Sequence, residues 1–104
     1  MGNARSINIH VEKIGKQFII QVKVIYKRKS VGWPIMKDKI NLNHYYIFVN
    51  LNGDQMPVPN FFIATGKESY DKCKQSSTRG IVDLSTLNNV DFLGNWEKLN
   101  KDSF

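Results

Sequence analysis

Two stretches in the first half of the chain alternate apolar and polar residues, and they predict neighbouring β-strands. Residues 5–11 place isoleucine and valine on one face and serine, asparagine and histidine on the other. A short glycine-containing connection follows, and residues 17–26 return as the expected hairpin partner. The even-numbered residues from 18 to 24 are apolar and are expected to face a core, whereas Gln21 and Lys23 project together from the opposite face.

The middle of the chain predicts two more strands. Residues 44–51 are almost continuously apolar, which indicates a central strand covered on both faces. Residues 61–64 form a fourth strand. Between the second and third strands, Pro34 is expected to block regular pairing and Trp33 to need a partner surface.

A helix and a short closing segment complete the chain. Thr65 and Glu68 match a capping box, which predicts a helix over about residues 66–76. Residues 81–84 are a short strand, and a last helical segment near residues 92–99 packs back on the sheet. The order predicts a single α+β domain over residues 1–104, with one mixed or antiparallel sheet of about four to five strands and one or two packing helices.

The cysteine content and the hydropathy of the chain indicate where in the cell this domain is expected. Cys73 is the only cysteine, so no internal disulfide can form, and a cytoplasmic location is expected. The sequence has no signal-peptide pattern and no apolar run long enough to cross a bilayer, so no membrane partner is expected.

Positive charge is concentrated in the first 43 residues. They hold nine lysines and arginines against two acidic residues, a net charge of +7, whereas residues 44–104 hold six basic and seven acidic residues. Such asymmetry is typical of a surface that meets phosphates, although lysines that only solvate a protein are the alternative.

Several common sites are absent from the sequence, but one arrangement fits a metal-dependent nuclease. There is no glycine-rich phosphate loop, and His10 and His44 lack neighbours at metal-site spacing. A nuclease of this kind needs an acidic metal ligand on one strand, with a second ligand and a water-orienting lysine two residues apart on the next. Gln21 and Lys23 have the second spacing, and Asn8, thirteen residues before Gln21, occupies the matching place on the preceding strand.

At these positions the chain resembles a group of small PD-(D/E)XK, or restriction-endonuclease-like, nuclease-fold proteins. The resemblance lies in Gly2-Asn3-Ala4 with Asn8, Ile20-Gln21-Val22-Lys23, Trp33-Pro34, and residues 46–52, 61–64, 80–84 and 95–99. It implies a truncated restriction-endonuclease-like core, a mixed sheet flanked by helices, that binds Mg²⁺ and cleaves DNA. In that family a glutamine often takes the (D/E) place, which is here Gln21.

The chain departs from that family where the metal would bind. Asn8 fills the place of the catalytic aspartate, and a neutral amide is a poorer ligand than a carboxylate for a hard dication. Glu12 is on the same face but four residues from Asn8, about 13 Å along a strand, and is a weak candidate ligand. With only four residues before Arg5, we also expect the helix that precedes the first strand in the family to be missing. We therefore expect a catalytically degenerate member in which Mg²⁺ binding is not assured, or a fragment that needs a second chain.

Three functions follow as hypotheses. The leading one is DNA binding through the basic first half, with contacts from Arg5, Lys23, Lys27, Arg28 and Lys29 and from Trp33, for which a core position is the favoured alternative. The second is an active Mg²⁺- or Mn²⁺-dependent DNA endonuclease with Gln21, Lys23 and Glu12 at its site. The third is a protein-interaction module or homodimer, formed through a sheet face that the missing helix leaves under-covered.

Overall fold

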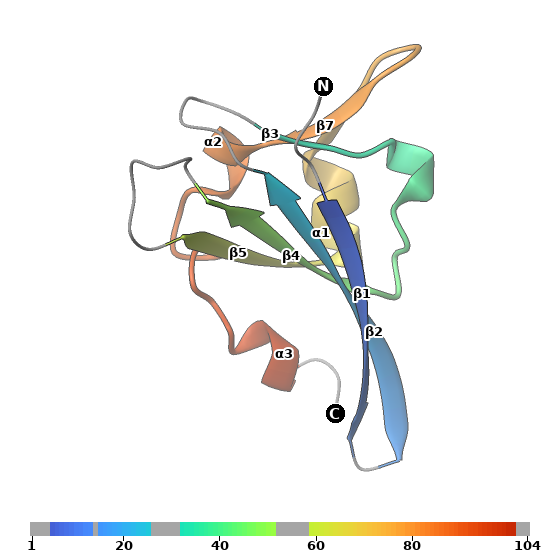
Figure 1. The fold of residues 1–104 in the computed structure, drawn as a ribbon, viewed down its shortest axis with the longest axis vertical. Helices are drawn as coiled ribbons and strands as arrows, with labels where there is room; N and C mark the ends of the chain where they lie inside the picture. The colour runs from blue at the N-terminus through green and yellow to red at the C-terminus, as the bar shows by residue number, and fades with distance from the viewer. Residues whose placement is uncertain (1–4, 14, 26–31, 52–58, 102–104) are drawn as a thin grey trace.

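Strands dominate the computed structural model, which is an α+β fold of two packed sheets and short helices (Figure 1). The structure describes residues 5–13, 15–25, 32–51 and 59–101. The predicted α+β class with a mixed sheet is confirmed. In this part of the chain no helix is both long and apolar enough to cross a membrane.

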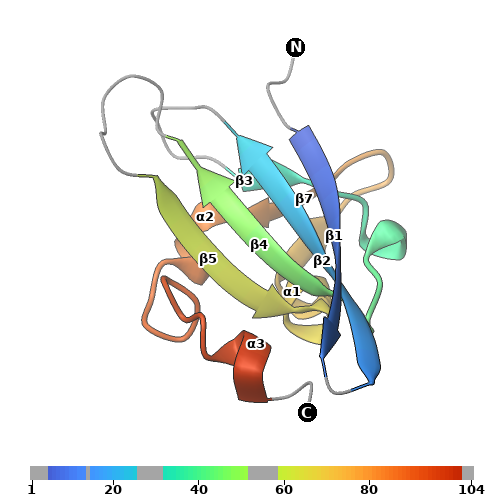
Figure 2. The same cartoon turned by 60° about the horizontal axis from the view of Figure 1, so that its bottom comes forward.

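The larger sheet has the strand order β1-β2-β4-β5 (Figure 2). Its strands are β1 (Arg5–Lys13), β2 (Lys16–Ile25), β4 (Tyr45–Asn50) and β5 (Asn60–Thr65). The β1–β2 and β4–β5 pairs are antiparallel, whereas β2 and β4 run parallel. Every residue of β4 is buried, as predicted for a central strand.

A second sheet of three short strands packs on one face of the larger one, and most of it was not predicted. It consists of β3 (Gly32–Pro34), β7 (Gly80–Asp83) and β6 (Cys73–Gln75), in that order. The expectation that Pro34 blocks pairing is wrong, because Pro34 is the last residue of an edge strand and pairs opposite Ile81. Proline is tolerated at such an edge, since its missing N–H can face away from the ladder.

Four short helices connect and close the strands: η1 (Lys37–Lys39), α1 (Gly66–Lys72), α2 (Leu84–Leu87) and α3 (Lys98–Lys101). The predicted capping box opens α1, since the Thr65 hydroxyl accepts from the Glu68 N–H at 3.1 Å and the Glu68 carboxylate accepts from the Thr65 N–H at 2.9 Å. The helix is shorter than predicted because Cys73 leaves it and pairs with Val82 in the second sheet. That pairing buries Cys73.

The larger hydrophobic core lies between the two sheets. It is formed by side chains from β2, β4, β5 and the second layer, namely Ile25, Trp33, Ile35, Ile40, Tyr46, Phe48, Phe62, Ala64, Cys73, Val82, Leu87 and Phe92. Because β2 contributes only Ile25 and β1 contributes nothing, the second layer covers β4, β5 and one end of β2. Among the described residues, this core includes no residue of β1 and no other residue of β2.

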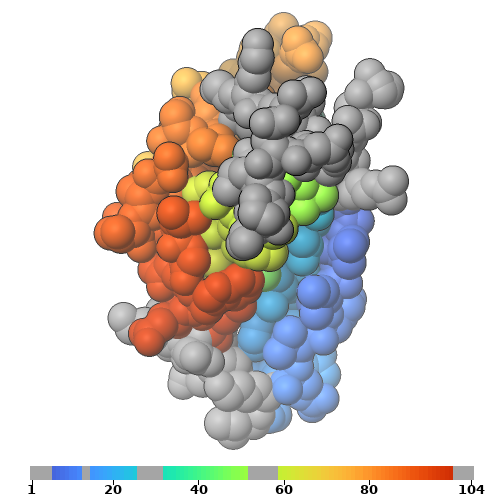
Figure 3. All heavy atoms as spheres, turned by 60° about the vertical axis from the view of Figure 1, so that its left-hand side comes forward, coloured from blue at the N-terminus to red at the C-terminus, as the bar shows by residue number. Residues whose placement is uncertain are grey.

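A smaller core lies on the other face of the larger sheet. Its buried members are Ile20, Tyr45, Ile47, Val49 and Ile63, and Phe18, Val22 and Val24 pack against it, as the alternation of β2 predicted. The C-terminal segment covers only part of this face, and the strands of the first half stay visible beside it in Figure 3. On β1, Ile7 is 54% exposed and Ile9 is 43% exposed.

Trp33 is the centre of the larger core. Its side chain is fully buried, its Nε1 donates to the Val49 carbonyl at 3.0 Å, and its ring lies 5.2 Å from that of Phe48 and 5.6 Å from that of Phe62. The hypothesis that Trp33 contacts DNA is therefore wrong. The favoured alternative, a core position, is the one observed.

We predict that Trp33→Ala lowers the free energy of unfolding by about 3–5 kcal/mol, because it leaves a cavity between the sheets. Trp96→Ala is a matched control, since Trp96 is 46% exposed and packs only on Phe61 among the described rings. Its cost should be about 1 kcal/mol. Urea unfolding measures both values, and an equal cost would contradict the assigned position of Trp33.

Candidate nucleic-acid interface

Strand pairing brings a set of polar side chains together on the uncovered part of the larger sheet. In the antiparallel hairpin, Ser6 pairs with Lys23 and Asn8 pairs with Gln21. Paired residues point to the same face, so these four side chains form one cluster, which we call the polar strip. Ser6 and Asn8 are exposed, whereas Gln21 and Lys23 are partly buried.

The predicted neighbourhood of Asn8, Gln21 and Lys23 is thus present in the structure. Asn8 lies directly opposite Gln21, and Lys23 lies two residues further along β2 on the same face. Their roles as metal ligands or catalytic groups remain predictions. Ser6 is the member of the strip to which the sequence analysis gave no role, although the alternation of residues 5–11 had placed it on this face.

The side-chain amide of Gln21 is held by protein groups. Its Nε2 lies 2.9 Å from His44 Nδ1 and donates to the Tyr46 hydroxyl at 3.1 Å. The Tyr46 hydroxyl also accepts from the Asn41 N–H at 2.8 Å. Burial raises the pKa of Tyr46, and the Asn41 N–H partly offsets this effect. Gln21 therefore ties β2 to β4 and to the loop before it.

Neither His44 nor Tyr46 was predicted as part of the site. Both reach Gln21 because β2 and β4 pair in parallel, with Gln21 opposite Tyr46. A parallel pair needs a long connection rather than a tight turn. Nothing in the local sequence around either residue indicates that pairing.

Lys23 has a hydroxyl, and no described carboxylate, as its partner. Its Nζ donates to the Ser6 Oγ at 2.9 Å. Burial lowers the pKa of Lys23, because desolvation disfavours the charged form. A partly buried ammonium group without a counterion attracts an anion.

The carboxylate proposed as a further ligand lies away from the strip. Glu12 is exposed and lies opposite Gln17, four residues from Asn8 and so about 13 Å along β1. Among the described residues, no three His, Cys, Asp or Glu side chains form a group that could hold a metal ion. Mg²⁺ prefers carboxylate oxygens. The strip offers amides, a hydroxyl and an ammonium group instead, and these residues do not fit that ion.

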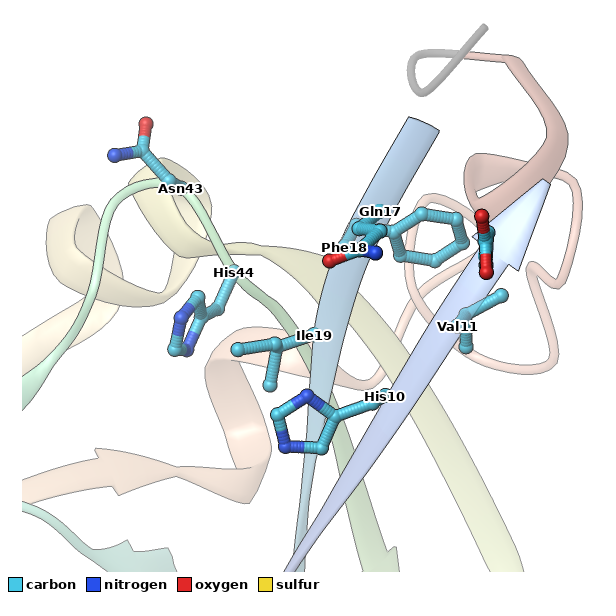
Figure 4. A pocket seen from close by; sticks show the side chains of 8 residues that line it. His10, Val11, Gln17, Phe18, Ile19, Asn43 and His44 are labelled. Atoms are coloured by element: carbon cyan, nitrogen blue, oxygen red, sulfur yellow. The ribbon is translucent and has the colours of Figure 1, made fainter. Parts of the chain in front are cut away.

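Beyond the strip, the same face ends in a hollow of about 550 Å³ between the hairpin and the loop before β4 (Figure 4). It is lined by His10, Val11, Glu12, Gln17, Phe18, Ile19, Asn43 and His44, and we call it the histidine hollow. The pKa of His44 is lowered by burial and, to a smaller degree, by the nearby His10.

The basic residues of the first half fall into two groups. Lys27, Arg28 and Lys29 lie outside the described residues, and of Arg5 and Lys13 only the backbone, in β1, is described. Lys16, Lys23, Lys37 and Lys39 are described and form no ion pair with other described residues. The three ion pairs of the described chain join Lys67 to Asp71, Lys74 to Asp83 and Lys98 to Glu68. All three of these ion pairs therefore join residues of the second half of the chain.

Comparison with known proteins gives no relative. No protein-family model, curated protein or solved structure matches the chain. The resemblance to PD-(D/E)XK nucleases therefore stays a prediction from the sequence.

We predict that Asn8→Asp creates a Mn²⁺ site, because it places a carboxylate opposite Gln21. Isothermal titration calorimetry should show Mn²⁺ affinity at least about tenfold above that of the wild type, since ligand charge governs the affinity for hard cations. Asn88→Asp, the same change at an exposed residue directly after α2, is the control and should have little effect. An Asn8→Asp variant with wild-type affinity would show that the metal position was assigned wrongly.

We also predict that stability falls between pH 7.5 and pH 5.5 through His44. The folded-state pKa of His44 lies below its unfolded value of about 6.5, so the unfolded chain takes up the proton first as the pH falls. The stabilisation is therefore complete above pH 6.5 and declines below it. Thermal unfolding of wild type and His44→Gln tests this. The variant should lose less stability over that interval, and equal losses would exclude His44 as the cause.

Proposed function

We propose that this protein binds DNA through the polar strip and the basic first half of the chain, without metal-dependent cleavage. The observation that carries the proposal is Lys23, a partly buried ammonium group whose described partner is the Ser6 hydroxyl. The other groups of the strip suit the same ligand, because phosphate oxygens accept hydrogen bonds from lysine, serine and asparagine side chains.

The open face of the hairpin supports access by an extended polyanion. Ser6, Asn8 and His10 are exposed along β1, and no residue of this strand belongs to the core that the described part of the second layer covers. β1 is an edge strand, so no further strand of the larger sheet stands between the strip and solvent. A nucleic-acid backbone can therefore lie along the strand direction.

Charge supports the same partner. The first 43 residues carry a net charge of +7, and their described lysines form no ion pair within the described chain. Neutralising phosphates with such lysines releases counterions, which gives affinity without sequence recognition. Arg5, Lys27, Arg28 and Lys29 would add to this attraction.

The proposal excludes cleavage because the strip lacks the groups that the reaction needs. A hydrolytic metal site requires ligands that hold the ion and lower the pKa of its bound water. Asn8 and Gln21 are both neutral amides, and the described residues place no group of three His, Cys, Asp or Glu side chains around them. An active endonuclease that relies on Glu12 therefore has no support from the geometry.

One observation favours a second candidate, an interaction surface on β1. Ile7 and Ile9 are exposed on the face opposite the strip. Exposed apolar side chains on an edge strand favour pairing with another chain. A homodimer through β1 would leave the strip on its own face, so it is compatible with DNA binding.

The test of DNA binding is Lys23→Ala, measured by fluorescence anisotropy with a labelled single-stranded DNA oligonucleotide. Wild-type affinity should fall steeply with salt, and the variant should bind less tightly, with a salt slope smaller by about 0.7, the value for one phosphate contact on a single strand. Lys67→Ala is the matched control, because Lys67 is exposed and pairs with Asp71 on α1. A flat salt response, or equal losses in both variants, would contradict the proposal.

A further inference from the structure

The histidine hollow continues the face of the polar strip but has a different chemistry. His10 lies opposite Ile19, and His44 directly precedes Tyr45, which lies opposite Ile20. The two imidazoles therefore flank Ile19 in one row, with His10 on β1, Ile19 on β2 and His44 directly before β4, as Figure 4 shows. Ile19 is four residues from Lys23 on β2, about 13 Å along the strand.

The lining of the hollow does not suit a phosphate. Among the described residues that line it there is no lysine or arginine, and Glu12 contributes a carboxylate. An anion would therefore gain no lysine or arginine partner and would be repelled by that carboxylate. The ligand that fits is uncharged.

The histidines are suited to stacking. Gln21 Nε2 is a hydrogen-bond donor, so the Nδ1 of His44 that it contacts acts as the acceptor and carries no proton. Burial and the nearby His10 lower the pKa of His44, which favours the same neutral form. A neutral imidazole offers a flat face to a ring, and the Ile19 side chain between the two imidazoles is apolar.

Amide groups at the margin of the hollow complete its chemistry. Gln17 and Asn43, both exposed, are among the residues that line the hollow, from the hairpin and from the loop, and the Asn43 amide lies at its outer edge (Figure 4). Each amide carries both donors and an acceptor. This is the combination that recognises the hydrogen-bonding edge of an unstacked base.

From this geometry we infer that the histidine hollow binds one unpaired nucleobase of a DNA strand whose phosphates lie on the polar strip. The inference rests on the proposed function. A base in the hollow and a phosphate at Lys23 would be about 13 Å apart, a span that about two nucleotide steps of an extended single strand cover. Single-stranded DNA is then preferred over a duplex, because a paired base cannot enter.

The experiment compares two single strands of equal charge by fluorescence anisotropy. One is an ordinary DNA oligonucleotide, and the other is its abasic analogue built from tetrahydrofuran spacers. Wild-type protein should bind the intact strand about tenfold more tightly, which is the effect of stacking one base on an aromatic side chain. His10→Ala should remove this preference, and His10→Phe, which keeps a flat ring, should restore it.

The outcomes separate this inference from the proposed function. Equal wild-type affinity for both strands would overturn the base site while leaving phosphate binding intact. An equal loss of affinity for both strands in His10→Ala would do the same. Lys23→Ala should weaken both strands alike. If neither strand binds, the proposed function fails. Titration with adenosine then tests separately whether the histidine hollow binds a base. Shifts of the His10 and His44 imidazole signals would support it, and unchanged signals would overturn it.

Discussion

The parallel pairing of β2 with β4 is the constraint on which both the core and the candidate interface depend. Two parallel strands cannot be joined by a tight turn, so the chain must return across one face of the sheet before it can pair again. Residues 32–44 of that return carry Trp33, Ile35 and Ile40 into the larger core. The same passage ends at His44, beside the polar face of β2. One connection therefore supplies core packing and completes the site.

Gln21 holds the end of that connection in place through hydrogen bonds. Its amide contacts His44 and Tyr46, and the Tyr46 hydroxyl accepts from the backbone of Asn41. The start of α1 packs closely on the same loop. A Cβ on Gly66 would overlap the backbone of Asn41 and Leu42, so only glycine allows this contact. A side chain at the position that the resemblance gives to a metal ligand thus joins three segments of the fold. Lys23 lies two residues further along β2, and no described carboxylate neutralises its charge. This charge supports the proposed binding function rather than a catalytic one.

The hydrophobic pattern predicted the larger sheet well because its strands are long enough to show their period. Residues 5–11 alternate cleanly, and their pairing with β2 places Asn8 opposite Gln21 as expected. The continuous apolar run of β4 predicted its burial on both faces. The capping box predicted the start of α1, since that signal is local to Thr65 and Glu68.

The second layer and half of the site could not be predicted in the same way. β3 and β6 have three residues each, too few to show a period, and they are held by pairing with β7 rather than by their own sequence. The sequence left both a core and a surface position open for Trp33. Its contacts with Phe48 and Phe62 place it in the core. His44 and Tyr46 reach Gln21 through a pairing between distant segments, which propensity does not reveal.

We propose that the polar strip is the surface on which a nucleic acid lies. Backbone amide chemical shifts of ¹⁵N-labelled protein, titrated with a single-stranded DNA oligonucleotide, test it most directly. The account predicts the largest shifts at Ser6, Asn8 and Lys23, with little change along α1. Shifts confined to α1 and the segment around Lys98, or no shifts at low salt, would contradict it.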